Sequence, residues 1–181
     1  FMFNSFKDSA GDIWIGGVHS EVICYLAGEK RFKFFPSRPV RTFAEHSPGK
    51  ILMACTYGLI MLDKQTGETE ILMNGYLCHD ILVKDNNICV ATSGDGLIRY
   101  DFVERTIEKF TAENGLVSNH VNSIVYDEGS LWLGTENGLC RFGIEDGVAT
   151  TYPSVYSLSK YPFNVNADIR LRNGELMLGT N

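Results

Sequence analysis

The sequence has no apolar run long enough to cross a bilayer and no excess of positive charge. Among its 181 residues, 22 acidic side chains outnumber 16 Lys and Arg, and the formal net charge is −6. A membrane-spanning helix needs roughly 20 consecutive apolar residues, whereas the nearest candidate, 51–62, is broken by Thr56, Tyr57 and Gly58. Phosphate backbones require clustered Lys and Arg, and these cluster only briefly at 30–33. We therefore expect neither nucleic acid as a partner nor direct membrane contact by this segment.

Helical periodicity and paired cysteines are also lacking. Gly, β-branched and aromatic residues interrupt every window that could form a long helix. The five cysteines, Cys24, Cys55, Cys78, Cys89 and Cys140, are odd in number and lack the close spacing of zinc ligands. We expect them to be free thiols buried in strands, where a thiol behaves as a small hydrophobe. The sequence predicts no metal and no cofactor.

What the sequence does contain is a short apolar run, closed by two small residues, that occurs five times. The runs are separated by 38, 37, 43 and 45 residues, which is the spacing of an internal repeat. The first small residues of the five runs are Gly16, Ala54, Ala91, Gly134 and Gly179.

Each run is flanked by further strand-like segments and by turns containing Asn-Gly or Asp-Gly, which favour hairpins. Because the runs are apolar on both faces, each is expected to lie between packed neighbours, and the small residues are expected where backbones approach closely. The pattern predicts an all-β chain, a β-propeller fragment of about four and a half four-stranded antiparallel blades. The expected blades are 1–35, 40–73, 78–110 and 121–152, with a half blade at 165–181. Their fourth strands are expected near 31–35, 69–73, 106–110 and 148–152.

A fragment of this kind would expose apolar blade faces at its ends. We expect the remaining blades of the same propeller, or a second copy of the chain, to cover them.

Two of the units resemble the "two-component regulator propeller" repeat. The units at 40–73 and 78–110 are more divergent, since they lack the Trp and carry Ala54 and Ala91 in place of Gly. The residues that carry the resemblance are 114–124, Asp127, Gly129, 131–135, Gly138, Leu139, Arg141 and Phe142 in one unit, and Asp8, Gly11 and 13–17 in the other.

The resemblance implies a segment without catalysis of its own, from the periplasmic sensor region of a bacterial hybrid two-component system. The parent chain would then be an inner-membrane receptor, with a histidine kinase and receiver modules after a membrane span. The implied signal is a glycan fragment, so an oligosaccharide is the implied ligand. The implied mechanism is a ligand-shifted arrangement of domains in a homodimer.

Recognition is expected on loops, because the motif residues have structural explanations. Trp14 and Trp132 are expected to pack between blades, and Asp8 and Asp127 to cap tight turns. The turns between second and third strands should share one rim with the crossings between blades, where polar and aromatic side chains suit a polar ligand such as a sugar. The rim candidates for ligand binding are Arg38, Tyr57, His79, Asp95, Asn119, His120, Asn137 and Tyr161.

Two other classes of function stay open. Propellers also include glycosidases and lyases, and 127–132 is similar to the turn of the sialidase Asp box, although Val125 stands where that motif has Ser or Thr. No pair of carboxylates and no nucleophile with a base can be assigned as catalytic. His79 and His120 could approach one another, but they lack a third metal ligand. The other class is a protein-interaction scaffold.

Overall fold

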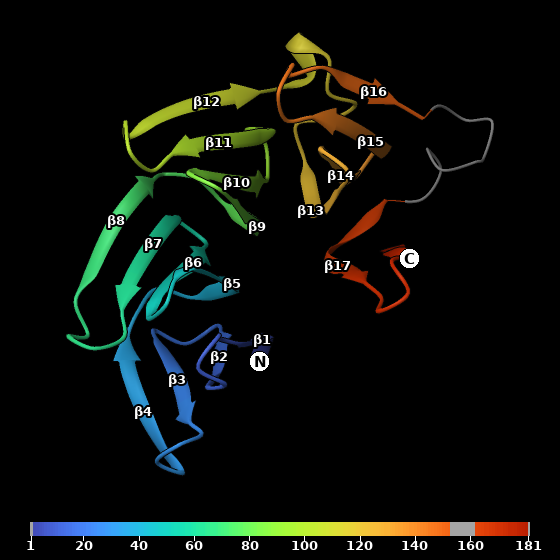
Figure 1. Ribbon diagram of the computed structural model, residues 1–181. Helices are drawn as coiled ribbons and strands as arrows, with labels where there is room; N and C mark the ends of the chain where they lie inside the picture. The colour runs from blue at the N-terminus through green and yellow to red at the C-terminus, as the bar shows by residue number, and fades with distance from the viewer. Residues whose placement is uncertain (1, 153–161, 181) are drawn as a thin grey trace. The chain divides into compact units, whose positions relative to one another are not determined.

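The computed structural model describes residues 2–152 and 162–180 (Figure 1). The chain divides into two compact units, Phe1–Val83 and Lys84–Asn181, which are described separately. Both consist of antiparallel strands in which sequence neighbours pair, and the described helical structure is one 3-10 turn, η1 (Ala112–Asn114). Four four-stranded sheets and one two-stranded sheet confirm the all-β class and the four-stranded blades of a propeller.

The first unit contains two complete sheets, which run in the orders β1-β2-β3-β4 and β5-β6-β7-β8. The strands of the first sheet are β1 (Met2–Lys7), β2 (Ile13–Gly17), β3 (Glu21–Leu26) and β4 (Arg31–Pro36). Those of the second are β5 (Val40–Ser47), β6 (Lys50–Cys55), β7 (Gly58–Asp63) and β8 (Thr69–Asn74).

The third sheet has the order β12-β11-β10-β9. The first unit ends within β9, which is the first strand of this sheet along the chain. Its strands are β9 (Cys78–Lys84), β10 (Asn87–Thr92), β11 (Leu97–Asp101) and β12 (Thr106–Phe110). The fourth sheet contains β13 (Val121–Asp127), β14 (Ser130–Thr135), β15 (Gly138–Gly143) and β16 (Ala149–Thr151). The last sheet pairs β17 (Phe163–Arg170) with β18 (Leu176–Thr180).

The core of the first unit lies between its two sheets. Trp14 is fully buried there and stacks on Phe35 with ring centroids 5.4 Å apart. The ring of Phe43, from β5 of the other sheet, lies 6.4 Å from the Trp14 ring. Apolar side chains from β6 and β7 complete the cluster, so the two sheets share one dry interface.

The small residues that close the second strands do permit close approach between neighbouring sheets. A Cβ added to Gly16 would lie 2.8 Å from the Phe43 ring, and one added to Gly134 would lie 2.9 Å from Cβ of Phe163 on β17. Contacts this short are not tolerated without movement of the neighbour. The explanation offered by the sequence for these glycines is therefore confirmed.

The sequence expectation for Trp132 was wrong in part. Trp14 is fully buried, but Trp132 is only half-buried, and its described aromatic partner is Tyr152, with ring centroids 5.3 Å apart. The physical reason is that Trp14 is enclosed by Phe35 from its own sheet and Phe43 from the next, whereas no described aromatic ring of β17 lies on Trp132.

The cysteines behave as expected. All five are buried and free, and burial raises the pKa of Cys24, Cys89 and Cys140 to about 11 and that of Cys55 to about 12. In the described part of the chain, no helix is long and apolar enough to span a membrane.

Candidate functional site

In the second unit, the β10–β11 turn, the crossing before β13 and the β14–β15 turn meet at one edge. The carbonyl oxygen of Asn119 accepts hydrogen bonds from the amides of Gly94 (3.0 Å) and Gly96 (2.8 Å). Its side-chain oxygen accepts a third, from the amide of Ala112 at 2.7 Å. Asn119 therefore fixes the crossing to the β10–β11 turn, and its side-chain oxygen is already engaged.

His120 lies at the centre of this edge and joins the three segments. A hydrogen bond of 3.0 Å links Nδ1 of His120 to the Ser93 hydroxyl, and Nε2 lies 3.9 Å from Oε1 of Glu136. The Ser118 hydroxyl donates to the same Glu136 oxygen at 3.2 Å and accepts a hydrogen bond from the His120 amide at 3.0 Å. The side chains of His120 and Glu136 remain 45% and 46% exposed. We call Ser93, Ser118, His120 and Glu136 the His120 cluster.

The His120 cluster has the geometry of a polar recognition surface. One side of its imidazole is hydrogen-bonded to a hydroxyl and the other side faces a carboxylate at 3.9 Å, so that the ring is oriented without being buried. Hydroxyl, imidazole and carboxylate groups can together donate and accept hydrogen bonds. The arrangement suits a ligand with many hydroxyl groups.

In the first unit, the equivalent edge brings Arg38 to the β6–β7 turn. Nη1 of Arg38 donates to the carbonyl oxygen of Tyr57 at 2.9 Å and to the side-chain oxygen of Asn74 at 3.1 Å. The Tyr57 ring is 67% exposed beside this anchored guanidinium. An exposed aromatic face next to hydrogen-bonding groups suits stacking against a sugar ring. Arg38, Tyr57 and Asn74 are called the Tyr57 cluster.

The remaining predicted site residues lie outside these two clusters. His79 is buried in β9, at 7% exposure, so it does not present a free loop side chain as expected. Its neighbours in the strand, Cys78, Asp80 and Ile81, are buried as well. Asp95 forms an ion pair with Lys109 at 2.9 Å, and Asn137 is exposed in the β14–β15 turn. Tyr161 lies outside the described residues.

Sequence reasoning missed Ser118 and Asn74, which complete the two clusters. Asn74, at the end of β8, accepts a hydrogen bond from the predicted residue Arg38. Ser118 donates a hydrogen bond to Glu136, which precedes the predicted residue Asn137. Ser and Asn are common in turns, so their identity alone gave no signal. Across the described residues, no three His, Cys, Asp or Glu side chains are grouped as metal ligands would be.

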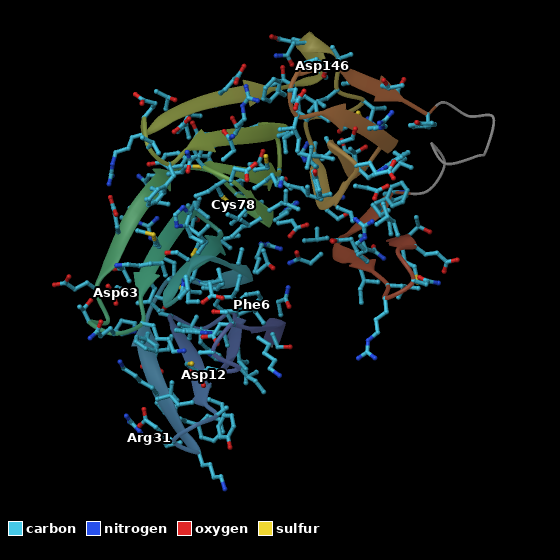
Figure 2. All side chains as sticks on the ribbon, viewed as in Figure 1. Phe6, Asp12, Arg31, Asp63, Cys78 and Asp146 are labelled. Atoms are coloured by element: carbon cyan, nitrogen blue, oxygen red, sulfur yellow. The ribbon has the colours of Figure 1, made fainter. Side chains whose placement is uncertain are left out.

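The hollows of the surface lie at other turns. One of about 340 Å³ is lined by Lys50, Asp63 and their neighbours, and one of about 120 Å³ by Arg141, Asp146 and theirs. Asp63 and Asp146 are labelled in Figure 2. In the first, a hydrogen bond from Lys50 lowers the pKa of Asp63 to about 2. Both are shallow. The β5–β6 and β7–β8 turns form the first, and the β15–β16 turn forms the second with residues of β14, β15 and β16.

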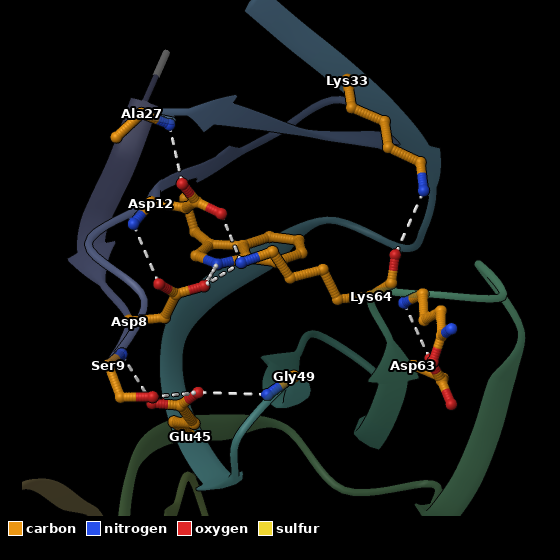
Figure 3. Close-up of polar contacts among 11 residues, drawn as sticks. Asp8, Ser9, Asp12, Ala27, Lys33, Glu45, Gly49, Asp63 and Lys64 are labelled. Atoms are coloured by element: carbon orange, nitrogen blue, oxygen red, sulfur yellow. Dashed lines mark hydrogen bonds and ion pairs between the residues drawn. The ribbon is translucent and has the colours of Figure 1, made fainter. Parts of the chain in front are cut away.

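A buried polar network in the first unit is structural (Figure 3). Oδ1 of Asp8 accepts the amide hydrogen of Asp12 at 2.9 Å, which confirms the predicted turn cap. Oδ2 accepts hydrogen bonds from Nε1 of Trp14 at 3.0 Å and from Nζ of Lys64 at 2.7 Å. The same Lys64 forms an ion pair with Asp12. Asp127, for which a cap was also expected, instead binds Nη2 of Arg170 at 2.8 Å.

Comparison with family models gives no match, and neither does comparison with curated proteins. Solved structures do match in fold. The extracellular domain of the putative hybrid two-component system BT4673 from B. thetaiotaomicron matches with a TM-score of 0.80 at 18% identity, covering 99% of this chain and 25% of that one. The corresponding domain of BT3049 from the same organism matches with a TM-score of 0.72 at 18% identity, with the same coverage.

A third match has a different origin. The computationally designed Ika4 protein matches with a TM-score of 0.61 at 9% identity, covering 84% of this chain and 90% of that one.

The chain spans about a quarter of the length of the two extracellular domains. Identities this low establish the fold alone. At that level, they confirm the resemblance identified in the sequence, since the two matched domains come from the class of sensor that it implied.

Proposed function

We propose that this chain is a segment of the extracellular sensor region of a hybrid two-component system, and that it has no catalysis of its own. The observation that carries the proposal is the fold match, which extends over 99% of the chain, to extracellular domains of two such systems. The His120 cluster and the Tyr57 cluster support it, because they present fixed polar groups and one exposed aromatic ring on loops held by rigid sheets.

The proposed ligand is an oligosaccharide. Tyr57 would stack on a sugar ring, while Arg38 and Asn74 hold the turn that presents it. In the second unit, His120 and Glu136 would exchange hydrogen bonds with sugar hydroxyls, in the orientations set by Ser93 and Ser118. Each cluster is proposed as a contact surface by itself.

The proposal includes a periplasmic location and a homodimeric parent receptor with a histidine kinase. Ligand binding would favour one arrangement of the receptor over another, and can shift that equilibrium only by the difference between its affinities for the two. Signal transmission therefore requires a ligand contact that differs between the two arrangements.

The test is binding and signalling in the whole receptor. A panel of oligosaccharides is screened by thermal shift, and kinase autophosphorylation is then measured with each oligosaccharide that binds. We expect at least one oligosaccharide to stabilise the protein and to change autophosphorylation by about tenfold, within the usual range of allosteric coupling.

Variants separate a ligand surface from a general effect on folding. Tyr57→Ala and His120→Ala should weaken oligosaccharide binding, whereas Val103→Ala, at a 63% exposed site in the β11–β12 turn, should leave it unchanged. Turnover of an oligosaccharide that is lost with Glu136→Gln would favour the enzyme alternative. A protein partner in the absence of any oligosaccharide binding would favour the scaffold alternative.

A further inference from the structure

One face of the first sheet carries a continuous set of large apolar side chains that remain exposed or half-buried. Ile13 lies opposite Tyr25, which lies opposite Phe32, while Ile15, Ile23 and Phe34 form the adjacent row. Ile13, Phe32 and Phe34 are 39%, 57% and 59% exposed, and Ile15, Ile23 and Tyr25 are half-buried. The opposite face, which includes Trp14, packs on the second sheet. The residues Ile13, Ile15, Ile23, Tyr25, Phe32 and Phe34 are called the open face.

The repeat gives each inner position of the open face a counterpart in the second sheet. Counting from the small residues Gly16 and Ala54, the counterparts of Ile13, Ile15, Ile23 and Tyr25 are Ile51, Met53, Ile60 and Leu62. These four are 0–5% exposed, and they belong to the cluster that packs against Trp14 of the preceding sheet. The same sheet face is therefore covered in the second sheet and uncovered in the first.

The fourth sheet repeats the covered arrangement. Its counterparts are Leu131, Leu133, Cys140 and Phe142, none of which is more than 2% exposed. Phe142 contacts Phe110 of β12, in the sheet before it, with ring centroids 4.6 Å apart. In both cases the covering element is the sheet that precedes in the chain.

The first and second sheets differ in the exposure of their inner strands, not of their outer strands. Phe34, on the outer strand, is paired with Ile23 as Ile71 is with Ile60, and Ile71 is itself 52% exposed. Outer strands are thus exposed even where a neighbouring sheet is present. The difference lies on the inner strands, where Ile13 is 39% exposed and its counterpart Ile51 is 0% exposed.

We propose that a further four-stranded sheet of this repeat, from the same polypeptide, packs on the open face. Its contacting face would be of the type that covers Ile51 and Met53, with large apolar side chains beside a small residue such as Gly16. Two observations favour the same polypeptide as the source. Each covered face is packed by the preceding sheet, and the extracellular domains of the same fold are about four times as long as this chain. The proposal does not depend on what the protein senses.

The test is thiol accessibility at Ile13 in the full polypeptide encoded by the gene. Ile13→Cys places a reporter on the open face, and Val103→Cys places a matched reporter at an exposed turn. The described native thiols give little background, because all are buried. If a sheet covers the face, a maleimide should label Ile13→Cys about tenfold or more slowly than Val103→Cys, since reaction then requires local opening. In the 181-residue chain alone, the two should react at similar rates.

Further variants make each outcome decisive. Ile51→Cys, at the covered counterpart, should be protected in both proteins, and Tyr25→Cys should repeat the result of Ile13→Cys if the latter does not fold. Equal labelling of Ile13→Cys and Val103→Cys in the full polypeptide would overturn the proposal. Protection in the full polypeptide that grows with protein concentration would also overturn it, and would identify a second copy as the occupant.

Discussion

Lys64 places an ammonium group inside the first unit, and two aspartates partner it. Its side chain is 17% exposed, and those of Asp8 and Asp12 are 0% and 10% exposed. Both carboxylates also accept backbone amide hydrogens, from Asp12 and from Ala27. Each buried charge therefore has several partners. The removal of Asp8 leaves the Trp14 indole and the Asp12 amide without their acceptor, while Lys64 keeps its ion pair with Asp12.

We predict that Asp8→Ala lowers the free energy of unfolding by about 3 kcal/mol, because the buried Trp14 indole and the Asp12 amide lose their acceptor and Lys64 loses one of its two carboxylate partners. The matched control is Asp127→Ala at the equivalent turn. Its partner Arg170 is 48% exposed, so the loss should be about 0.5 kcal/mol. Urea unfolding followed by Trp fluorescence measures both. Equal losses would show that burial of the ion pair is unimportant.

Ser123 is the opposite case of a buried polar group. It is 0% exposed, and among the described residues its hydroxyl oxygen has no hydrogen-bond partner. We predict that Ser123→Ala keeps or raises the unfolding free energy, by up to about 1 kcal/mol, because an unpaired hydroxyl is costly to bury. Ser118→Ala, which removes a hydroxyl with two hydrogen bonds, should lose about 1 kcal/mol. A clear loss for Ser123→Ala in the same urea titration would contradict this.

At the scale of the strands, the second strands of the first and fourth sheets each bring a neighbouring sheet into close contact. Gly16 accepts the Phe43 ring where any larger residue would meet it, and Gly134 does the same for Phe163. The interlock is steric, so its strength depends on side-chain volume at one position in each strand.

Gly16→Ala tests this interlock. Its Cβ would lie within 3.0 Å of the Phe43 ring and of Cβ of Val40, and we predict a loss of about 1–3 kcal/mol from overpacking. Gly28→Ala is the control, since a Cβ there meets nothing within 4 Å. It should be neutral or slightly stabilising, because alanine restricts the unfolded chain. Thermal melts of the two variants should differ clearly in Tm, and coincident melts would show that the Gly16 contact relaxes at no cost.

The strands were predictable from sequence because their signals are local. The expected fourth strands 31–35, 69–73, 106–110 and 148–152 correspond to Arg31–Pro36, Thr69–Asn74, Thr106–Phe110 and Ala149–Thr151. Apolar runs, small closing residues and Gly turns all act within a few residues, so each strand could be located from its own neighbourhood.

At the scale of the molecule, contacts between distant segments were not predictable. Lys64 lies 56 residues from Asp8, and no local pattern connects them. For the candidate site, the shared edge followed from the blade topology, but the partners that orient His120 did not. Nor did the sequence show that His79 faces a buried environment, since a His at the start of a strand fits equally well on either side of it.

The charged groups of the first unit also set how the stability of the molecule depends on pH. Burial raises the pKa of Asp8. Hydrogen bonds from Lys64, Trp14 and the Asp12 amide together lower that pKa by a larger amount, so it lies below its usual value. Burial lowers the pKa of Lys64, but hydrogen bonds to Asp12 and Asp8 raise it above its usual value. Burial lowers the pKa of His46.

The signs of these shifts, together with those of the thiols, predict a plateau of stability between about pH 7 and pH 8. Above about pH 8.5 the unfolded chain ionises its cysteines, whereas burial raises the pKa of Cys24, Cys55, Cys89 and Cys140 in the native state, so stability falls. Below about pH 6.5 the unfolded chain protonates His46 more readily than the native state does, so stability falls slightly. The contribution of Asp8 is complete above about pH 4 and is lost as the pH falls through its lowered native pKa. That of Lys64 is complete below about pH 10 and is lost as the pH rises through its raised native pKa.

Asp8→Asn isolates the acid part of this profile, because asparagine does not titrate but can still accept a hydrogen bond from Trp14. We predict that the unfolding free energies of the wild type and the variant, measured in urea from pH 2 to pH 9, differ by a constant amount above about pH 5 and begin to converge below about pH 4. The convergence follows because the carboxyl is protonated first in the unfolded chain and then, as the pH falls through its lowered pKa, in the native state. A difference that stays constant down to pH 3 would mean that the ionisation of Asp8 contributes nothing to the fold, and that its hydrogen bonds alone hold the turn.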